Sequence, residues 1–286
     1  MEHISFKEIN NKKIETIVFI HTNLVNSWIW KNQQNVFDNY NQIYINLHEN
    51  TENMKNSNFS IKKTSANIKK LIKNKIKDQK IHFVGIGLGG QIILYILATY
   101  PELVKTAIVS GVNVKTSKYS KEYDELTAIL ENKKIEQLLI AIKTTSEEIL
   151  SKKSSKFLTS AYLAEYGLHK KEHLKDITHS LNEINEDKMI NITKESLKFK
   201  IPELKNPSET DKKDVLVLYG TKEYPKVAKS AKIIKKHLKN VQIYTSYRSI
   251  HLWNLIEYVK FNTIVKEFIK DKKINLENKP YLKKIE

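Results

Sequence analysis

The chain of 286 residues has no cysteine, only seven glycines and a single arginine. The absence of cysteine excludes a disulfide scaffold, a cysteine nucleophile and thiolate metal ligands. No apolar run approaches the roughly 20 residues that a membrane-spanning helix needs. The polar N-terminal segment has no apolar stretch typical of a secretory signal. We therefore expect a cytoplasmic protein without a transmembrane segment.

Acidic residues are also scarce relative to basic ones, with 32 Asp and Glu against 49 Lys and Arg and a net charge of +17. Such an excess of positive charge suggests nucleic acid or an anionic membrane surface as a partner. However, Arg248 is the one arginine, and arginine is the residue that contacts phosphate and guanine in a bidentate manner. The chain is also rich in Asn and Ile, which share A/T-rich codons with Lys. Base composition thus explains the charge more simply, and we expect no specific binding of nucleic acid.

Short β-branched runs alternate with amphipathic stretches along most of the chain. Most of the runs are continuously apolar, as expected for parallel strands that are covered on both faces. The alternation predicts an α/β fold with a mostly parallel sheet flanked by helices. Strands are predicted at 4–9, 15–20, 42–47, 81–85, 106–110, 215–219 and 241–245, and helices at 25–40, 64–78, 88–99, 225–238 and 252–269.

The region 114–206 interrupts this alternation because it contains helical patterns but no convincing strand. We expect it to be a helical cap or lid inserted into one core, whose two parts are residues 1–113 and 207–286. The tail 270–286 is charged, and we expect it to be peripheral.

Four of the seven glycines, Gly85, Gly87, Gly89 and Gly90, lie within six positions between a predicted strand and a predicted helix. This concentration marks the expected functional site. Gly85, Gly87 and Gly90 satisfy G-x-G-x-x-G, the fingerprint of dinucleotide-binding Rossmann folds. Gly85, Gly87 and Gly89 instead match a nucleophile elbow, G-x-S-x-G, with Gly87 in the place of the serine.

The surrounding sequence favours the elbow. A Rossmann fold has an acidic residue about 20 positions after the turn, whereas the next strand here ends in Ser110, Gly111, Val112 and Asn113. The glycine turn also follows two or three strands, whereas a Rossmann turn usually opens its domain. A Rossmann-type dinucleotide binder is kept as an alternative.

The segment FVGIGLGGQIILYILATYPELVKTAIVSG resembles the elbow, helix and next strand of the α/β-hydrolase superfamily, specifically the small bacterial hydrolases with a helical cap. TIVFIHTN resembles the strand before the oxyanion hole, VLVLYGTKE the strand that carries the acid, and SIHLWNLIEYVKFNTIVKEFI the histidine loop with its closing helix. The order elbow, acid, histidine is the one this fold uses. The resemblance covers both halves of the predicted sheet but hardly the cap.

The resemblance implies a catalytic triad, and its nucleophile is missing. Gly87 has no side chain, whereas Glu223 and His251 match the acid and the histidine. The family's His-Gly before the oxyanion hole reads His21-Thr22, and the loop 48–53 lacks the family's Pro, Gly and Ser.

Four further positions are implied for the oxyanion hole and the pocket by the same resemblance. These are His21, Asn23, Leu88 and Trp28, with the backbone N–H groups of Asn23 and Leu88 as the donors to a developing negative charge.

The loss of the nucleophile together with two supporting loops favours a non-hydrolytic protein that binds a small molecule or a protein partner, without a cofactor or metal. One alternative is an enzyme in which His251, oriented by Glu223, acts as a general base without a serine. Another is an esterase-type hydrolase inactivated by replacement of Ser by Gly.

Other hydroxyl and histidine residues are interpreted as structural. Ser110, Ser246 and Ser249 do not occupy a sharp strand-to-helix turn, so we interpret them as ordinary turn residues. His169 to His173 satisfy the H-x-x-E-H zinc motif, but the lysine-rich surroundings disfavour a cation, and we interpret the segment as a solvated cap helix.

Overall fold

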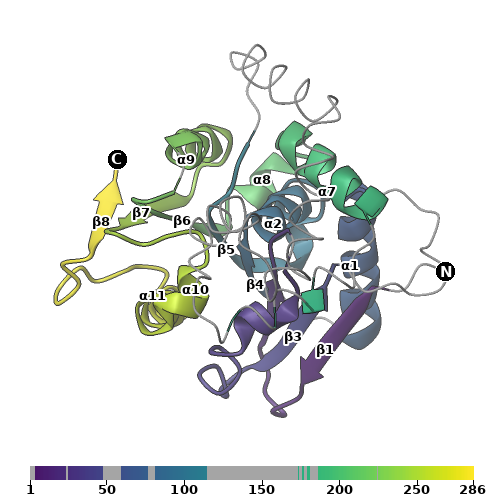
Figure 1. Ribbon diagram of the computed structural model, residues 1–286, viewed down its shortest axis with the longest axis horizontal. Coiled ribbons are helices and arrows are strands. Elements are labelled where there is room, and N and C mark those ends of the chain that lie inside the picture. The colour runs from purple at the N-terminus through teal and green to yellow at the C-terminus, as the bar shows by residue number, and fades with distance from the viewer. Residues whose placement is uncertain are drawn as a thin grey trace, which may run out of the picture.

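The computed structural model describes residues 4–23, 25–47, 59–76, 81–114, 173, 176, 179–180, 186–223 and 225–286, and the statements below concern these residues. Their strands form one sheet in the order β1-β3-β2-β4-β5-β6-β7-β8 (Figure 1). Strands β2 to β7 run parallel, whereas β1 and β8 are antiparallel at the two edges. The bounds are β1 Ser5–Ile9, β2 Thr16–Ile20, β3 Asn41–Asn46, β4 Ile81–Ile86, β5 Val104–Ser110, β6 Asp214–Gly220, β7 Val241–Ser246 and β8 Leu282–Ile285.

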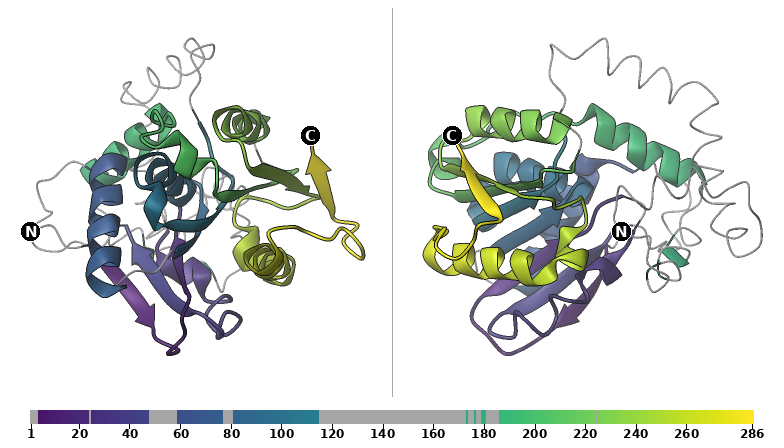
Figure 2. Two further views of the ribbon diagram at one scale, coloured as in Figure 1. Left: turned by 180° about the vertical axis from the view of Figure 1, so that it is seen from behind. Right: turned by 60° about the vertical axis from the view of Figure 1, so that its left-hand side comes forward.

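Helices cover both faces of the sheet, as the two views in Figure 2 show. One face packs against η1, α10 and α11, and the other packs against α1, α2, α7 and α9. The bounds are η1 Ser27–Trp30, α1 Ile61–Lys75, α2 Leu88–Thr99, η3 Pro101–Leu103, α7 Glu186–Lys198, α8 Pro207–Thr210, α9 Pro225–His237, α10 Trp253–Ile256 and α11 Tyr258–Asp271.

The central strands read as continuous apolar runs because both of their faces are buried. In β2, Ile17 and Phe19 belong to one core cluster, whereas Val18 and Ile20 belong to the other. The same division holds in β6, in which alternate residues point to opposite faces. The predicted α/β architecture with a mostly parallel sheet is therefore confirmed, and each of the seven predicted strands is present.

Strand β8 was not predicted, because only one of its four side chains is buried. Leu282 is 6% exposed and belongs to a core cluster, whereas Lys283 and Lys284 are exposed. The tail is charged as expected, but it is not merely peripheral, since β8 pairs with β7 and completes the sheet. Lysine on an edge strand is a common means of preventing further strand pairing.

The predicted helix 25–40 is wrong. The structure has the short 3₁₀ helix η1 followed by turns. Hydrogen bonds to a distant segment are the physical reason, because Asn32 Nδ2 donates to the carbonyl of Leu255 at 3.1 Å and Gln33 Nε2 donates to that of Asn254 at 2.9 Å. The side chain of Asn26 accepts a hydrogen bond from the backbone N–H of Trp28 at 3.2 Å. The apolar residues of the segment, such as Trp30 and Phe37, still fill the core. The predicted helix 252–269 is also interrupted, at Glu257, and forms α10 and α11.

Most of the predicted cap, 114–206, lies outside the described residues, so the cap stays a prediction. Within this range the structure describes α7, which packs beside α2. In the described part of the chain, no helix has the length and apolar character needed to cross a membrane.

Acid is expected to destabilise the fold through a histidine buried in the sheet. His82 of β4 is fully buried, and its Nδ1 lies 2.8 Å from Oγ1 of Thr106. Burial, together with the positive charge of Lys272, lowers the pKa of His82 from 6.5 to about 4. Because the unfolded chain binds this proton more readily, stability is lost as the pH falls from 6.5 toward 4, by up to about 3 kcal/mol.

This expectation is tested by urea unfolding of the wild type and of His82→Gln at several pH values between 7 and 4.5. The loss of stability on acidification should be smaller in the variant. Some loss should persist, because burial also lowers the pKa of His21 to about 4. Identical pH dependence in the two proteins would contradict the role given to His82.

Candidate active site

The turn between β4 and α2 is the turn at which the sequence predicts a nucleophile elbow. Gly87 is its single residue and adopts φ 52° and ψ −114°, a conformation that side-chain-bearing residues rarely adopt. The backbone N–H of Gly87 donates to the carbonyl of Ser110 at 2.9 Å, which ties the turn to β5. The chain therefore makes a sharp strand-to-helix turn at this position, and no side chain projects from it.

The loops that carry the predicted acid and histidine are bonded to each other. The backbone N–H of Lys222 donates to the carbonyl of Ser249 at 3.1 Å, and the N–H of Arg248 donates to Oγ1 of Thr221 at 2.8 Å. The N–H of Thr221 also donates to the carbonyl of Ser246 at 2.9 Å. Three hydrogen bonds thus fix the loop after β6 against the loop after β7.

Glu223 and His251 face each other across these loops. Nδ1 of His251 lies 3.7 Å from Oε1 of Glu223, and the two side chains are 15% and 3% exposed. Neither carboxylate oxygen receives a hydrogen bond from another described residue. Gly111 provides the space for the imidazole, because a Cβ at this position would lie 2.6 Å from Nδ1.

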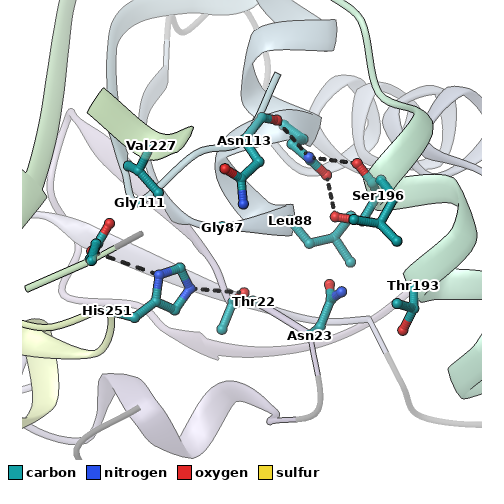
Figure 3. Close-up of a pocket in the computed structure, with 13 residues that line it drawn as sticks. Thr22, Asn23, Gly87, Leu88, Gly111, Asn113, Thr193, Ser196, Val227 and His251 are labelled. Atoms are coloured by element: carbon teal, nitrogen blue, oxygen red, sulfur yellow. Dashed lines mark hydrogen bonds and ion pairs between the residues drawn. The ribbon is translucent and has the colours of Figure 1, made fainter. Parts of the chain in front are cut away.

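On its other side, His251 faces the hydroxyl of Thr22 (Figure 3). Nε2 of His251 lies 3.4 Å from Oγ1 of Thr22, which is 3% exposed. A Cβ built on Gly87 would overlap this Oγ1 and would lie 3.0 Å from Nε2. The Thr22 hydroxyl therefore fills the space beside His251 that an elbow side chain would need.

His21 holds the loop that carries Thr22. Its Nε2 accepts a hydrogen bond from the backbone N–H of Leu47 at 2.9 Å, so Nδ1 carries the proton and donates to the carbonyl of Thr22 at 2.7 Å. The ring is fully buried, and burial lowers its pKa from 6.5 to about 4. His21 is thus a neutral part of the core, and the structure places it behind the pocket rather than in its lining.

A cavity of about 150 Å³ lies at the carboxyl ends of the parallel strands, where ligands bind in open α/β sheets. Five of the predicted site residues line it: Asn23, Gly87, Leu88, Glu223 and His251. Trp28 is not among the residues around this cavity. Its Nε1–H donates to Oγ of Ser180 at 2.7 Å, and its ring stacks on His173.

Several residues of the cavity were not predicted. Gln91 of α2 donates through Nε2 to the carbonyls of Asn113 at 2.8 Å and Ser196 at 2.9 Å, and its Oε1 accepts from Oγ of Ser196 at 2.9 Å. These bonds join α2, the loop after β5 and α7 at the rim of the cavity (Figure 3). A polar Gln in the otherwise apolar sequence of α2 is the signal that was available for this position.

The serines considered as substitutes for the nucleophile have structural partners. Ser110 accepts a hydrogen bond from Nε1–H of Trp253 at 2.9 Å. Oγ of Ser246 and Oγ of Ser249 lie 2.7 Å apart, and Ser249 also donates to the carboxylate of Glu257. None of the three lines the cavity described above. The H-x-x-E-H motif falls mostly outside the described residues.

Comparisons with known proteins agree with the fold. Residues 15–136 match the family of the alpha/beta hydrolase fold. MGS-M2, an alpha/beta hydrolase enzyme from a Medee basin deep-sea metagenome library, superimposes with a TM-score of 0.71 at 17% identity, with 95% of this chain and 96% of that one covered. MenH from S. aureus gives 0.67 at 17% identity, with 95% and 99% covered. The F128A mutant of an epoxide hydrolase from Bacillus megaterium gives 0.66 at 14% identity, with 94% and 98% covered.

No curated protein sequence matches the chain. The family match over residues 15–136, together with the sheet order and the solved structures, shows that the chain has the α/β-hydrolase fold. The glycine turn follows the fourth strand of the chain, not the first strand of a Rossmann unit. At these identities the solved structures establish the fold alone, and function has to be argued from the site.

The overlap between residue 87 and Thr22 predicts energetic coupling between the two positions. Gly87→Ser should lower the free energy of unfolding by about 1–3 kcal/mol more in the wild type than in the Thr22→Gly variant. The reason is that Thr22→Gly removes the hydroxyl with which the new side chain would overlap. The backbone strain at φ 52° is the same in both backgrounds and cancels. Urea unfolding of the wild type, both single variants and the double variant measures this coupling.

Additive effects of the two substitutions would contradict the overlap.

The same pair of positions matters for the alternative in which the protein is an esterase inactivated by replacement of its serine. Restoring serine alone would leave it competing with Thr22 for space, so we expect any restored activity to require Thr22→Gly as well as Gly87→Ser.

Proposed function

We propose that this protein is a hydrolytic enzyme in which His251, oriented by Glu223, acts as a general base on a small ester-type substrate. The observation that carries the proposal is the Glu223–His251 pair, with Nδ1 and Oε1 3.7 Å apart at the cavity. A carboxylate on one ring nitrogen favours the tautomer that leaves the other nitrogen free of a proton. In this chain that nitrogen is Nε2, on the side of Thr22.

The burial of Glu223 supports a functional pair. Removing a carboxylate from water is costly unless the charge is paired or hydrogen-bonded. The side chain of Glu223 is 3% exposed although it lies in the turn between β6 and α9, where an exposed position would avoid this cost. Its partner is the imidazole, which becomes positively charged when it accepts a proton. A buried carboxylate at this position therefore stabilises the protonated imidazole that general-base catalysis produces.

The N-terminus of α2 supplies electrostatic stabilisation beside the pair. The first N–H groups of a helix have no acceptor within the helix, and the helix dipole makes this end positive. Leu88 is the first residue of α2 and lines the cavity, as does Asn23. The N–H groups at these two positions are the donors we assign to the negative charge that develops on a carbonyl oxygen during ester hydrolysis.

The cavity restricts the substrate. Its volume of about 150 Å³ accommodates only a small group. Gln91, Asn113 and Ser196 add polar side chains to its lining. We infer a short acyl group that carries a hydrogen-bonding substituent, attached to a leaving group that extends out of the cavity.

A second candidate is the non-hydrolytic role that the sequence favours, in which the protein binds a small molecule or a protein partner. The observation in its favour is Gly87, which provides no nucleophile at the elbow. On this hypothesis the same cavity would hold its ligand without turnover, and the Glu223–His251 pair would serve binding alone.

Ester hydrolysis tests the two candidates. With short p-nitrophenyl esters, His251→Ala should lower kcat/KM by about 10²–10⁴-fold, since this is the usual contribution of a general base. Glu223→Gln should lower it less, because the imidazole remains. His237→Ala, at the exposed end of α9, is the matched histidine control and should leave the activity unchanged.

Turnover by the wild type that disappears in His251→Ala and persists in His237→Ala would exclude a purely binding role. If the wild type and His251→Ala release nitrophenol equally slowly over a series of short esters, the general-base proposal fails. Stabilisation of that inactive protein by a small carboxylic acid or ester in a thermal shift assay would then favour the binding role.

A further inference from the structure

We propose that Oγ1 of Thr22 is the nucleophile of this site, so that Thr22, His251 and Glu223 form a triad whose hydroxyl comes from the loop after β2 instead of the elbow. This inference rests on the function proposed above and names the group that His251 activates. Thr22 was not among the residues predicted from the sequence.

The first argument is the place of the hydroxyl. Oγ1 of Thr22 occupies the space that the Cβ of an elbow residue would take, and it lies 3.4 Å from Nε2 of His251. Hydrogen bonds between a nucleophile and its base are often long in ligand-free structures and shorten when substrate binds. Thr22 lines the same cavity as Leu88, which follows Gly87 directly. The hydroxyl thus lies next to the helix N-terminus to which we assign the stabilisation of a carbonyl oxygen.

The second argument is the order of the contacts. Oγ1 of Thr22 lies 3.4 Å from Nε2 of His251 (Figure 3). Nδ1 of the same ring lies 3.7 Å from Oε1 of Glu223. This is the sequence of nucleophile, base and orienting carboxylate that defines a triad by geometry, independent of chain position. The three residues follow β2, β7 and β6, whose carboxyl ends lie at one edge of the sheet.

The third argument is the exchange of residues between two neighbouring loops. Where the family has His-Gly and an elbow serine, this chain has His21-Thr22 and Gly87. Compared with the family, the hydroxyl residue is thus at position 22 and the glycine is at position 87. The space between these two positions has room for only one side chain. Loss of function alone would explain the glycine at the elbow, but it gives no reason for a hydroxyl within reach of Nε2.

The position of Thr22 is also fixed, as a nucleophile requires. Its carbonyl accepts the hydrogen bond from Nδ1–H of His21, whose ring is anchored in turn by the backbone N–H of Leu47. Thr22 as a whole is 3% exposed, so few rotamers are open to its side chain. An ordered nucleophile avoids the entropic cost of orientation in the transition state.

The reaction balances with these groups and water. Oγ1 of Thr22 transfers its proton to Nε2 of His251 and bonds to the ester carbonyl carbon, and the bond to the leaving oxygen breaks as His251 returns the proton to it. Water then attacks the acyl-threonine ester and gives a proton to Nε2. The acyl–Oγ1 bond breaks, the acid leaves, and the proton returns to Oγ1.

The experiment compares Thr22→Val, which keeps the shape and removes the hydroxyl, with Thr22→Ser, which keeps the hydroxyl. Thr263→Val, on the exposed face of α11, is the matched control. Each protein is assayed with short p-nitrophenyl esters and treated with an alkyl fluorophosphonate, and the adduct is located by peptide mass spectrometry. Circular dichroism and thermal unfolding verify that each variant is folded.

We expect the fluorophosphonate adduct on Thr22 in the wild type and on residue 22 of Thr22→Ser, and none at this position in Thr22→Val. Turnover should fall by about 10²–10⁴-fold in Thr22→Val and persist in Thr22→Ser and Thr263→Val. If folded Thr22→Val retains turnover that His251→Ala loses, Thr22 is not the nucleophile, whereas His251 still acts as a general base on water. If neither substitution changes the hydrolysis seen with the wild type, the general-base function fails, and this inference fails with it.

Discussion

Space for a single side chain in front of His251 is the constraint on which the arrangement of this site depends. The elbow backbone approaches the loop after β2 so closely that a Cβ on Gly87 would overlap Oγ1 of Thr22. The sizes of residues 87 and 22 are therefore coupled: a side chain at one position requires a small residue at the other. The missing elbow side chain and the hydroxyl at Thr22 are consequently two aspects of one packing arrangement.

The parallel sheet makes this arrangement possible, because it brings together loops that are distant in the sequence. Thr22, Gly87, Gly111, Glu223 and His251 follow five different strands, and all five strands end at the same edge. The strands are buried on both faces and hold these loops rigidly. Backbone hydrogen bonds between the loops after β6 and β7 add local order, so that the imidazole and the carboxylate are held by the backbone.

Much of the fold follows from local signals in the sequence. Continuous apolar runs identify seven of the strands, and the cluster of glycines identifies the sharp turn between β4 and α2. Prediction fails where a segment depends on distant partners. Strand β8 has one buried side chain and is defined by its pairing with β7. The segment 25–40 has an amphipathic pattern, yet side chains such as Gln33 form hydrogen bonds with Asn254 and Asn262, and the backbone forms turns instead of a helix.

The sequence by itself determined the α/β class and the position of the sharp glycine turn, and it predicts an acid and a histidine in the order typical of hydrolases. The conformation of glycines, apolar runs and motif spacing depend on residues close together in the sequence, so they can be predicted from the sequence. Only the tertiary structure decided which groups meet. Thr22 and His251 are 229 positions apart, and their contact depends on the order of strands in the sheet. The sequence marks a missing side chain at Gly87, whereas the structure places a threonine hydroxyl in the space that this glycine leaves.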